Sequence, residues 1–337
     1  MSKPVVLTGL RANNNLHLGN YFGGLLPIVD MAKHHSHEYQ VNLFVPDLHS
    51  FTTPIDHTKL KKQIHESLKL FVASGLPLEA DSVYLYRQSY IPAHSELTLI
   101  LNSFTGMGEM SRMTQYKDKS SNLSKDRLSV GLFDYPVLMA SDILLYGATY
   151  VPVGDDQTQH LEFTRDIAER MNAKFGKLFV VPKPVDEQHR FFGKDQGLRI
   201  RNLIDPSKKM SKSDESEKGV IYLNDQPEVA SKKIMNATTD SLGRVAFDYD
   251  RQPGVSNLLN LHALLGGDNS EYIGQAQYGP LKSAVSQKAS NFLVDFQASI
   301  AKVDDQKISH KLEISEIEMR EVANAKLLGV QKAIGLR

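Results

Sequence analysis

The 337-residue sequence contains no cysteine, and this absence excludes three kinds of chemistry. Disulfide bonds, thiolate zinc sites and a cysteine nucleophile cannot form, and the lack of disulfides fits a reducing cytoplasm. Tryptophan is absent as well, but many unrelated chains of this length also lack it, so its absence excludes nothing. We therefore expect a cytoplasmic protein that works through oxygen and nitrogen groups, with no protein-held metal and no tightly bound prosthetic group.

Long apolar runs and an excess of one charge are missing too. The run Val5–Leu7 is too short for the core of a signal peptide, and no later segment approaches the length of a membrane span. Lysine plus arginine and aspartate plus glutamate both number 39, so the chain lacks the overall positive field of proteins that coat nucleic acids. Any RNA contact must therefore be local, and no membrane partner is expected. The length suits two globular domains.

Strand and helix patterns alternate in the first half of the chain. Apolar β-rich runs predict strands, and helical spacing predicts helices between them. Such alternation indicates a parallel sheet with right-handed crossovers, in which ligands bind beyond the carboxyl ends of the strands. The predicted strands are Val5–Thr8, Val41–Val45, Ser82–Tyr86 and Tyr150–Val153, and the predicted helices are Leu18–Met31, Asp56–Ser74, Tyr135–Tyr146 and Gln157–Phe175.

After Pro206 strand signals nearly vanish. Helical spacing there predicts a second, mostly helical region, with no internal repeat and no long low-complexity tract. Between the two halves of the first region, the polar stretch Lys117–Arg127 is typical either of a solvated loop or of a functional insertion. The helices predicted after Pro206 are Val229–Ala237, Ser256–Leu265, Leu281–Ala301 and Ile317–Ile334.

The pentapeptide Lys209–Ser213 (Lys-Met-Ser-Lys-Ser) places two ammonium groups on one polar loop. Two lysines on such a loop suit a polyphosphate, because they neutralise the charge that develops as pyrophosphate leaves. Taken alone, a Lys/Ser pentapeptide is more often a solvated surface loop. Its interpretation therefore depends on a partner motif elsewhere in the chain.

That partner is Leu16–Tyr21, where the first loop becomes the first helix of the α/β region. A helix start offers unpaired N–H groups, Gly19 lets a nucleotide approach the backbone, and His17 and Asn20 can donate to phosphate or ribose oxygens. A lone His-x-Gly is more often a structural turn. No Gly-rich dinucleotide fingerprint or phosphate loop is present in this region to offer another mode of nucleotide binding.

In this order and at this separation, the two motifs resemble the HIGH and KMSKS signatures of the class I aminoacyl-tRNA synthetases. Three further blocks resemble the bacterial tryptophanyl branch, and the resemblance covers nearly the whole chain. The second histidine of HIGH is Asn20 here, which is common in that branch. The blocks are Gly108–Gln115, Gly131–Tyr146 and Val151–Gln157, with Asp47, His49 and Thr238–Ser241 as additional matches.

The resemblance implies an α/β fold: a Rossmann-like parallel-sheet catalytic domain of the HUP type and a mostly helical second domain. Residues 1–205 would bind ATP and tryptophan, with a polar insertion at about 112–130. Residues 206–220 would form the KMSKS loop, and residues 221–337 would meet the tRNA anticodon.

The resemblance also assigns residues. His17, Lys209 and Lys212 are the implied catalytic residues. The implied ATP-binding residues are Arg11, Ala12, Asn13, Gly19, Asn20, Lys119, Gly154, Asp155, Asp156, Ile200, Lys209, Met210, Ser211, Lys212 and Ser213. The implied tryptophan-binding residues are Asp142, Tyr135, Met139, Gln157, His49 and Gln115.

Asp142 also has a physical interpretation. A carboxylate on an apolar helix face beside Met139 and Ile143 is costly unless something donates to it, and an indole N–H would do so. A site built on that bond rejects phenylalanine, because the acceptor would stay unpaired. The alternative is a carboxylate bonded to a neighbouring helix or a backbone N–H.

One segment departs from the family pattern. The bacterial enzymes commonly have Gln-Pro-Ser-Gly before the first motif, whereas this chain has Arg11-Ala12-Asn13-Asn14, and Leu7 stands where an aromatic residue is frequent. Arg11 adds a charge that suits a phosphate or a carboxylate. The contacts implied for positions 11–13 depend on this substituted stretch.

The implied reaction is the ATP-dependent activation of L-tryptophan to tryptophanyl-adenylate, followed by transfer to tRNA(Trp). ATP with Mg²⁺, L-tryptophan and tRNA(Trp) are the expected ligands, and a homodimer is the expected assembly. Two alternatives stay open: a tyrosyl-tRNA synthetase, which shares the fold and motifs, and a synthetase-like regulator that binds adenylate or RNA without aminoacylating.

Overall fold

The computed structural model describes residues 3–11, 16–52, 55–121, 128–154, 157–192, 200–211 and 217–337, without the side chains of residues 119 and 121. The chain forms two compact units. Unit 1 comprises Met1–Asn14, Ile28–Gly193 and Asp304–Arg337, and unit 2 comprises Asn15–Pro27 and Lys194–Val303. The functional domains expected from the sequence stay a prediction, because compactness alone does not say which segments bind ATP or tRNA.

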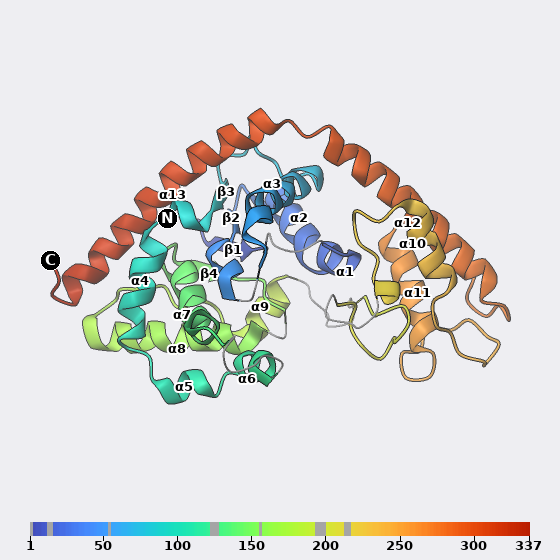
Figure 1. Cartoon of the computed structure of the whole chain (residues 1–337), viewed down its shortest axis with the longest axis horizontal. Coiled ribbons are helices and arrows are strands. Elements are labelled where there is room, and N and C mark those ends of the chain that lie inside the picture. The colour runs from blue at the N-terminus through green and yellow to red at the C-terminus, as the bar shows by residue number, and fades with distance from the viewer. Residues whose placement is uncertain are drawn as a thin grey trace. The chain divides into compact units, whose positions relative to one another are not determined.

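Unit 1 contains a four-stranded parallel sheet in the order β3-β2-β1-β4 (Figure 1). The sheet confirms the predicted α/β class. Apolar side chains on β1 and β2 are almost wholly buried, as expected for strands that are covered on both faces. The strands are β1 Val5–Gly9, β2 Gln40–Val45, β3 Val83–Arg87 and β4 Ala148–Tyr150.

The fourth strand exists where the sequence predicted one, but its bounds were wrong. It runs over Ala148–Tyr150 and not over Tyr150–Val153. The backbone N–H of Val151 donates to Gln188 Oε1 at 2.9 Å instead of continuing the ladder. A side-chain partner from a distant helix thus ends the strand, and local sequence carries no sign of it.

Some helices of unit 1 begin at side-chain caps. Asp56 caps α3 through the N–H of Thr58, and Ser129 caps α7 through the N–H of Leu132. The Ser129 cap starts α7 five residues before the predicted Tyr135. The helices are α2 Leu26–His35, whose first two residues belong to unit 2, α3 His57–Ala73, α4 Ala93–Asn102, α5 Met107–Ser111, α6 Thr114–Ser121, α7 Val130–Leu144, α8 Thr158–Phe175, α9 Val185–Phe191 and α13 Asp305–Ala333.

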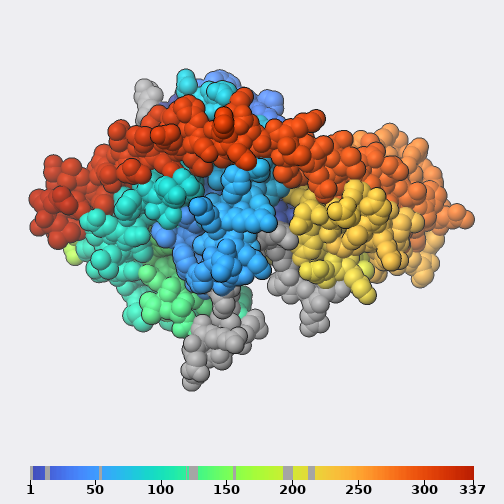
Figure 2. Space-filling view, turned by 45° about the horizontal axis from the view of Figure 1, so that its top comes forward, coloured from blue at the N-terminus to red at the C-terminus, as the bar shows by residue number. Residues whose placement is uncertain are grey.

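The last helix, α13, covers the edge of the sheet at β3. Ser315 Oγ accepts the backbone N–H of Leu85 at 3.2 Å, and Glu316 Oε1 accepts that of Arg87 at 3.2 Å. These bonds satisfy donors that an open edge strand would expose. In Figure 2 the red helix lies across blue and cyan segments of the same unit. It begins at Asp305, capped by Asp304, well before the predicted Ile317.

The described elements of unit 2 are helices, whereas the last helix of the region predicted after Pro206 belongs to unit 1. Around Tyr21 an aromatic cluster forms with Phe22, Phe292 and Phe296, whose ring centroids lie 5.0–5.2 Å from that of Tyr21. The cluster joins the first motif to α12. The helices are α1 Leu18–Asn20, a π-helical segment Tyr21–Leu25 that leads into α2, α10 Pro227–Met235, α11 Pro253–Leu264 and α12 Gly279–Ala301.

Candidate active site

In unit 1, two loops at the carboxyl ends of β2 and β3 are tied together by Gln88. Its Oε1 accepts the backbone N–H of Leu48 at 3.1 Å, which fixes the short 3₁₀ turn Leu48–Thr52 that carries His49. Its Nε2 reaches in the other direction, to Asp142 on α7. Ligands of parallel α/β sheets bind beyond this edge, so the position agrees with the sequence-based expectation.

Asp142 is 2% exposed and accepts from three side chains. Its Oδ1 lies 2.7 Å from Gln88 Nε2 and 2.6 Å from His94 Nδ1, and its Oδ2 lies 2.9 Å from His49 Nε2. The other nitrogen of His94 lies 2.8 Å from the hydroxyl of Tyr146. The carboxylate is thus the centre of a buried network that joins four elements of unit 1.

The network keeps Asp142 ionised. Burial alone would raise the pKa of this carboxyl, but hydrogen bonds from His49 and His94 and the charges they carry when protonated outweigh it, and the pKa is lowered. An ionised carboxylate is a stronger hydrogen-bond acceptor than a neutral oxygen group, so Asp142 suits one further N–H donor. Burial and the neighbouring carboxylate raise the pKa of Tyr146 well above its usual value, so its hydroxyl keeps its proton.

A second chain of contacts joins Tyr135 to Gln157 through His160. The Tyr135 hydroxyl lies 3.1 Å from His160 Nε2, and His160 Nδ1 lies 2.8 Å from Gln157 Oε1. The ring of Tyr135 also packs edge-on against that of His49, with centroids 6.2 Å apart. Four of the residues implied for tryptophan, namely Asp142, His49, Tyr135 and Gln157, are therefore linked directly or through His160.

Other predicted positions in unit 1 are placed but not tied to this network by a described contact. Met139 follows Tyr135 by one turn on α7 and is half-buried, as is Gln115 on α6. Gly154 is exposed, and its carbonyl accepts the N–H of Gln157 at 2.8 Å. Arg11 is half-buried just after β1. Their roles stay predictions.

In unit 2, the first motif forms a capping box at the start of α1. His17 Nδ1 accepts the N–H of Asn20 at 3.2 Å, and Asn20 Oδ1 accepts the N–H of His17 at 3.3 Å. Because Nδ1 is an acceptor, the neutral ring carries its proton on Nε2. The two capping bonds involve neither His17 Nε2 nor Asn20 Nδ2, which are the N–H donors that the nucleotide hypothesis invokes.

The same unit brings the first motif beside the second. Leu18 donates its N–H to Ile221 at 3.0 Å, and Leu223 donates to Leu16 at 2.9 Å. A Cβ on Gly19 would lie 3.7 Å from Met210 Cβ. Segments almost two hundred residues apart in sequence are thus neighbours, as the two motifs must be if they hold one phosphate chain.

A tight turn presents Lys209. Met210 donates its N–H to the carbonyl of Ile200 at 3.0 Å, so the predicted adenine-binding and KMSKS positions are backbone partners. Asp205 stabilises the turn by accepting from Ser207 and pairing with Lys208 at 3.2 Å. Lys209 is exposed, and Ser211 is half-buried. Outside the described residues lie Ala12, Asn13, Asp155, Asp156, Lys212 and Ser213, together with the side chain of Lys119.

Sequence reasoning missed the side chains that hold the site together. These are Gln88, His94, Tyr146 and His160. Each is buried, and a buried polar side chain requires a partner. The position of Gln88 directly after a strand was a usable signal. The pairing of His94 with Asp142 was not, because it joins helices 48 residues apart.

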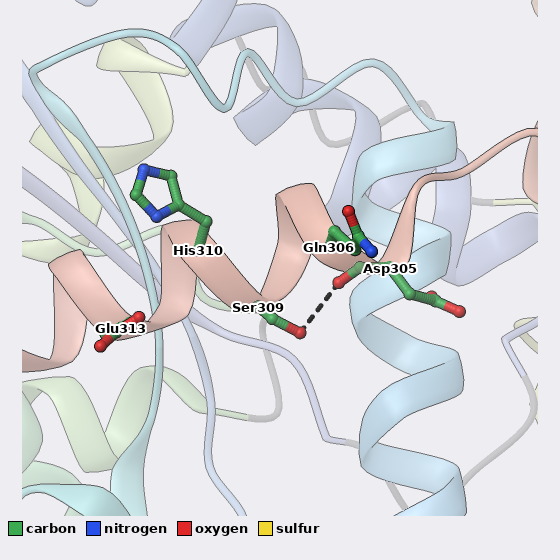
Figure 3. Close-up of a pocket in the computed structure, with 5 residues that line it drawn as sticks. All are labelled: Asp305, Gln306, Ser309, His310 and Glu313. Carbon is green, nitrogen blue, oxygen red and sulfur yellow. Dashed lines mark hydrogen bonds between the residues drawn. The ribbon is translucent and has the colours of Figure 1, made fainter.

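A surface hollow at the start of α13 is unrelated to these residues (Figure 3). It is lined by Asp305, Gln306, Ser309, His310 and Glu313, and Ser309 Oγ donates to the carbonyl of Asp305. Asp305 also pairs with Lys69 of α3 at 3.0 Å. Capping and helix packing account for these groups, and none of the predicted ligand-binding residues lines the hollow.

Comparison with known proteins identifies the family. Residues 1–293 match the model of the class I tRNA synthetases for tryptophan and tyrosine (W and Y). The chain belongs to this family. As a class I synthetase it is an enzyme, and the predicted α/β architecture and paired motifs are those of the family.

Relatives of this synthetase match over the full length. The tryptophan–tRNA ligase of Caldanaerobacter subterraneus is 38% identical over 336 residues, covering 98% of both chains. The crystal structure of tryptophanyl-tRNA synthetase from Mycoplasma pneumoniae superposes with a TM-score of 0.87 and 33% identity, over 100% of this chain and 99% of that one. That from Campylobacter jejuni, complexed with ADP and tryptophan, has a TM-score of 0.79 and 29% identity, over 98% and 100%.

Two features are absent from the described part of the synthetase. No helix there is long and apolar enough to cross a membrane. No group of three or more His, Asp or Glu side chains among the described residues is arranged to hold a metal ion.

Proposed function

We propose that the protein is a tryptophan–tRNA ligase, which activates L-tryptophan with ATP and transfers it to tRNA(Trp). The observation that carries the proposal is Asp142, a buried and ionised carboxylate in a chain that resembles tryptophan–tRNA ligases throughout its length. Such an acceptor suits the indole N–H of tryptophan. Tyr135 and Gln157, coupled through His160, supply oxygen atoms that suit the substrate ammonium.

The first step forms tryptophanyl-adenylate. A carboxylate oxygen of tryptophan attacks the α-phosphorus of ATP, the bond to the bridging oxygen breaks, and pyrophosphate leaves with the displaced electron pair. His17 and Asn20 donate to the nucleotide, Gly19 admits its close approach, and Lys209 neutralises the charge of the leaving pyrophosphate. Magnesium enters with the triphosphate as part of the substrate.

The other described residues proposed to contact the nucleotide are Arg11, Gly154, Ile200, Met210 and Ser211. Met139 and Gln115 are proposed to line the tryptophan site. The remaining proposed contacts are Ala12, Asn13, Lys119, Asp155, Asp156, Lys212 and Ser213.

The second step esterifies tRNA. A terminal ribose hydroxyl of tRNA(Trp) attacks the carbonyl carbon of the adenylate, AMP leaves, and the proton of the hydroxyl is released. By analogy with the family, we propose that residues 221–337 contact the tRNA anticodon. We also propose, by the same analogy, that the protein is a homodimer.

Amino-acid-dependent exchange of ³²P-pyrophosphate into ATP tests the proposal. We expect exchange with tryptophan and none above background with tyrosine. Exchange stimulated by tyrosine alone would support the tyrosyl alternative. A folded protein without exchange for any amino acid would support the non-aminoacylating regulator instead.

Gly19 allows a sharp test of the first motif. A methyl group there would meet His17 Cε1 and Nδ1 at 3.0 Å, so Gly19→Ala displaces the ring and weakens the cap. Misplacing a positioned group by about 1 Å lowers a rate by up to roughly 100-fold, and we expect exchange to fall 10- to 100-fold. Gly23→Ala is the matched control, because nothing lies within 4 Å of its added methyl. Equal losses in both variants would refute the role of His17.

A further inference from the structure

The carboxylate of Asp142 is held asymmetrically. Oδ1 receives two donors, Gln88 Nε2 at 2.7 Å and His94 Nδ1 at 2.6 Å, whereas Oδ2 receives one, His49 Nε2 at 2.9 Å. A carboxylate offers about four lone-pair positions, two on each oxygen. Both positions of Oδ1 are therefore filled, and one remains on Oδ2.

The side chain of His94 is not available to bind a substrate. Its side chain is 0% exposed, and both ring nitrogens are bonded, Nδ1 to Asp142 and Nε2 to the hydroxyl of Tyr146 at 2.8 Å. The hydroxyl of Tyr146 keeps its proton, because burial raises the pKa of this side chain. The ionised carboxylate of Asp142 only accepts, so the neutral ring carries its proton on Nδ1 and donates to Asp142. Nε2 then accepts from the hydroxyl of Tyr146, which stabilises this tautomer and fixes the orientation of the ring.

We propose that His94 is a positioning residue for tryptophan recognition: oriented by Tyr146, it fills Oδ1 of Asp142 together with Gln88, and so leaves Oδ2 with one position for a single substrate N–H. The inference rests on the proposed function. The single position on Oδ2 makes the site selective for a ring that donates one hydrogen bond and accepts none. An indole fits, whereas a phenol brings oxygen lone pairs that need donors of their own.

The direct test compares tryptophan with 3-benzothienyl-alanine, in which sulfur replaces the indole N–H in a ring of nearly the same shape. Pyrophosphate exchange gives kcat and KM for each amino acid. Loss of a hydrogen bond to a charged group corresponds to roughly 10- to 100-fold, and we expect wild type to prefer tryptophan by that factor. In His94→Leu the preference for tryptophan over the analogue should fall to a few-fold, because KM for tryptophan rises.

Three further variants separate positioning from folding. His94→Asn retains an N–H donor near the position of Nδ1 and keeps most of the preference. Tyr146→Phe keeps the ring volume, removes only the hydroxyl, and lowers the preference partway. Ser141→Ala is the matched control: Ser141 is equally buried and donates to the carbonyl of His94 at 3.1 Å, but it does not touch the imidazole. Ser141→Ala should change kcat and KM for tryptophan and for the thienyl analogue by the same factors, and so leave the preference unchanged.

The pH profile gives a readout that a structural role would not move. Burial raises the pKa of Asp142 and the hydrogen bonds of His49 and His94 lower it, so removing His94 raises it. As the pH is lowered, KM for tryptophan in His94→Leu should therefore begin to rise at a higher pH than in wild type. The other titratable groups facing Asp142 are His49, present in both proteins, and Tyr86 and Tyr146, whose pKa values are raised well above the usual value for tyrosine.

The outcomes are distinguishable. If His94→Leu and Tyr146→Phe both retain the wild-type preference for tryptophan over the thienyl analogue, the inference is overturned while the ligase activity stands. The same follows if wild type exchanges with both amino acids equally well. If wild type shows no exchange with tryptophan, the proposed function itself fails.

Discussion

Asp142→Ala is expected to raise the tryptophan concentration needed for half-maximal exchange by roughly 10- to 100-fold. The expectation follows from the loss of a hydrogen bond to a charged group, worth about 1.5–3 kcal/mol. The KM for ATP should stay close to wild type, because none of the contacts described for Asp142 involves a residue proposed to bind the nucleotide. Steady-state exchange at varied tryptophan and fixed saturating ATP measures the effect.

The variant also disturbs the protein itself. Removing the carboxylate leaves N–H donors of His49, His94 and Gln88 without their acceptor, and each unsatisfied buried donor costs about 1–3 kcal/mol. Asp142→Asn is therefore needed beside it, since the amide keeps the volume and one acceptor oxygen. Thermal unfolding shows whether each variant is folded. A folded Asp142→Ala with an unchanged tryptophan requirement would refute the ligand role of this residue.

The sequence was sufficient for the α/β class and the order of the elements, because apolar periodicity is a local property. Three of the four strands lie within one residue of their predicted ends. One error arises where a side chain distant in sequence ends a strand, and two arise where a capping residue sets the start of a helix. Gln188 ends β4 by accepting from Val151, and the Ser129 cap starts α7 early. Helix α13 was placed too late, because its polar first turns depend on the Asp304 cap and on packing.

For the site, the sequence named residues proposed to contact the ligands but missed the side chains that hold those residues in place. Asp142, His49 and Tyr135 are brought together as expected. His94 and His160 were not predicted, because their significance lies in pairings between separate helices. No periodicity or local motif encodes such a pairing. The asymmetry of the Asp142 carboxylate, on which the inference about His94 depends, could be seen only in three dimensions.

Lys209→Ala is expected to lower the rate constant for adenylate formation by roughly 100- to 1,000-fold, the range found when one preorganised donor to a transition-state charge is removed. Because this donor acts as pyrophosphate leaves, kcat should fall far more than the affinity for tryptophan. The turn itself should survive, since its bonds run through the backbones of Ile200, Asn202, Lys208 and Met210. Single-turnover measurement of adenylate formation tests this expectation.

The neighbouring lysine is a matched control. Lys208 is 67% exposed at its side chain and pairs with Asp205 at 3.2 Å, and such a surface ion pair contributes little to stability. Lys208→Ala should therefore leave adenylate formation within about two-fold of wild type. Lys209→Arg keeps the charge but changes the geometry, and an intermediate rate would indicate that charge alone is insufficient. If Lys208→Ala and Lys209→Ala lost activity equally, the effect would belong to the turn, and Lys209 would have no specific role with the pyrophosphate.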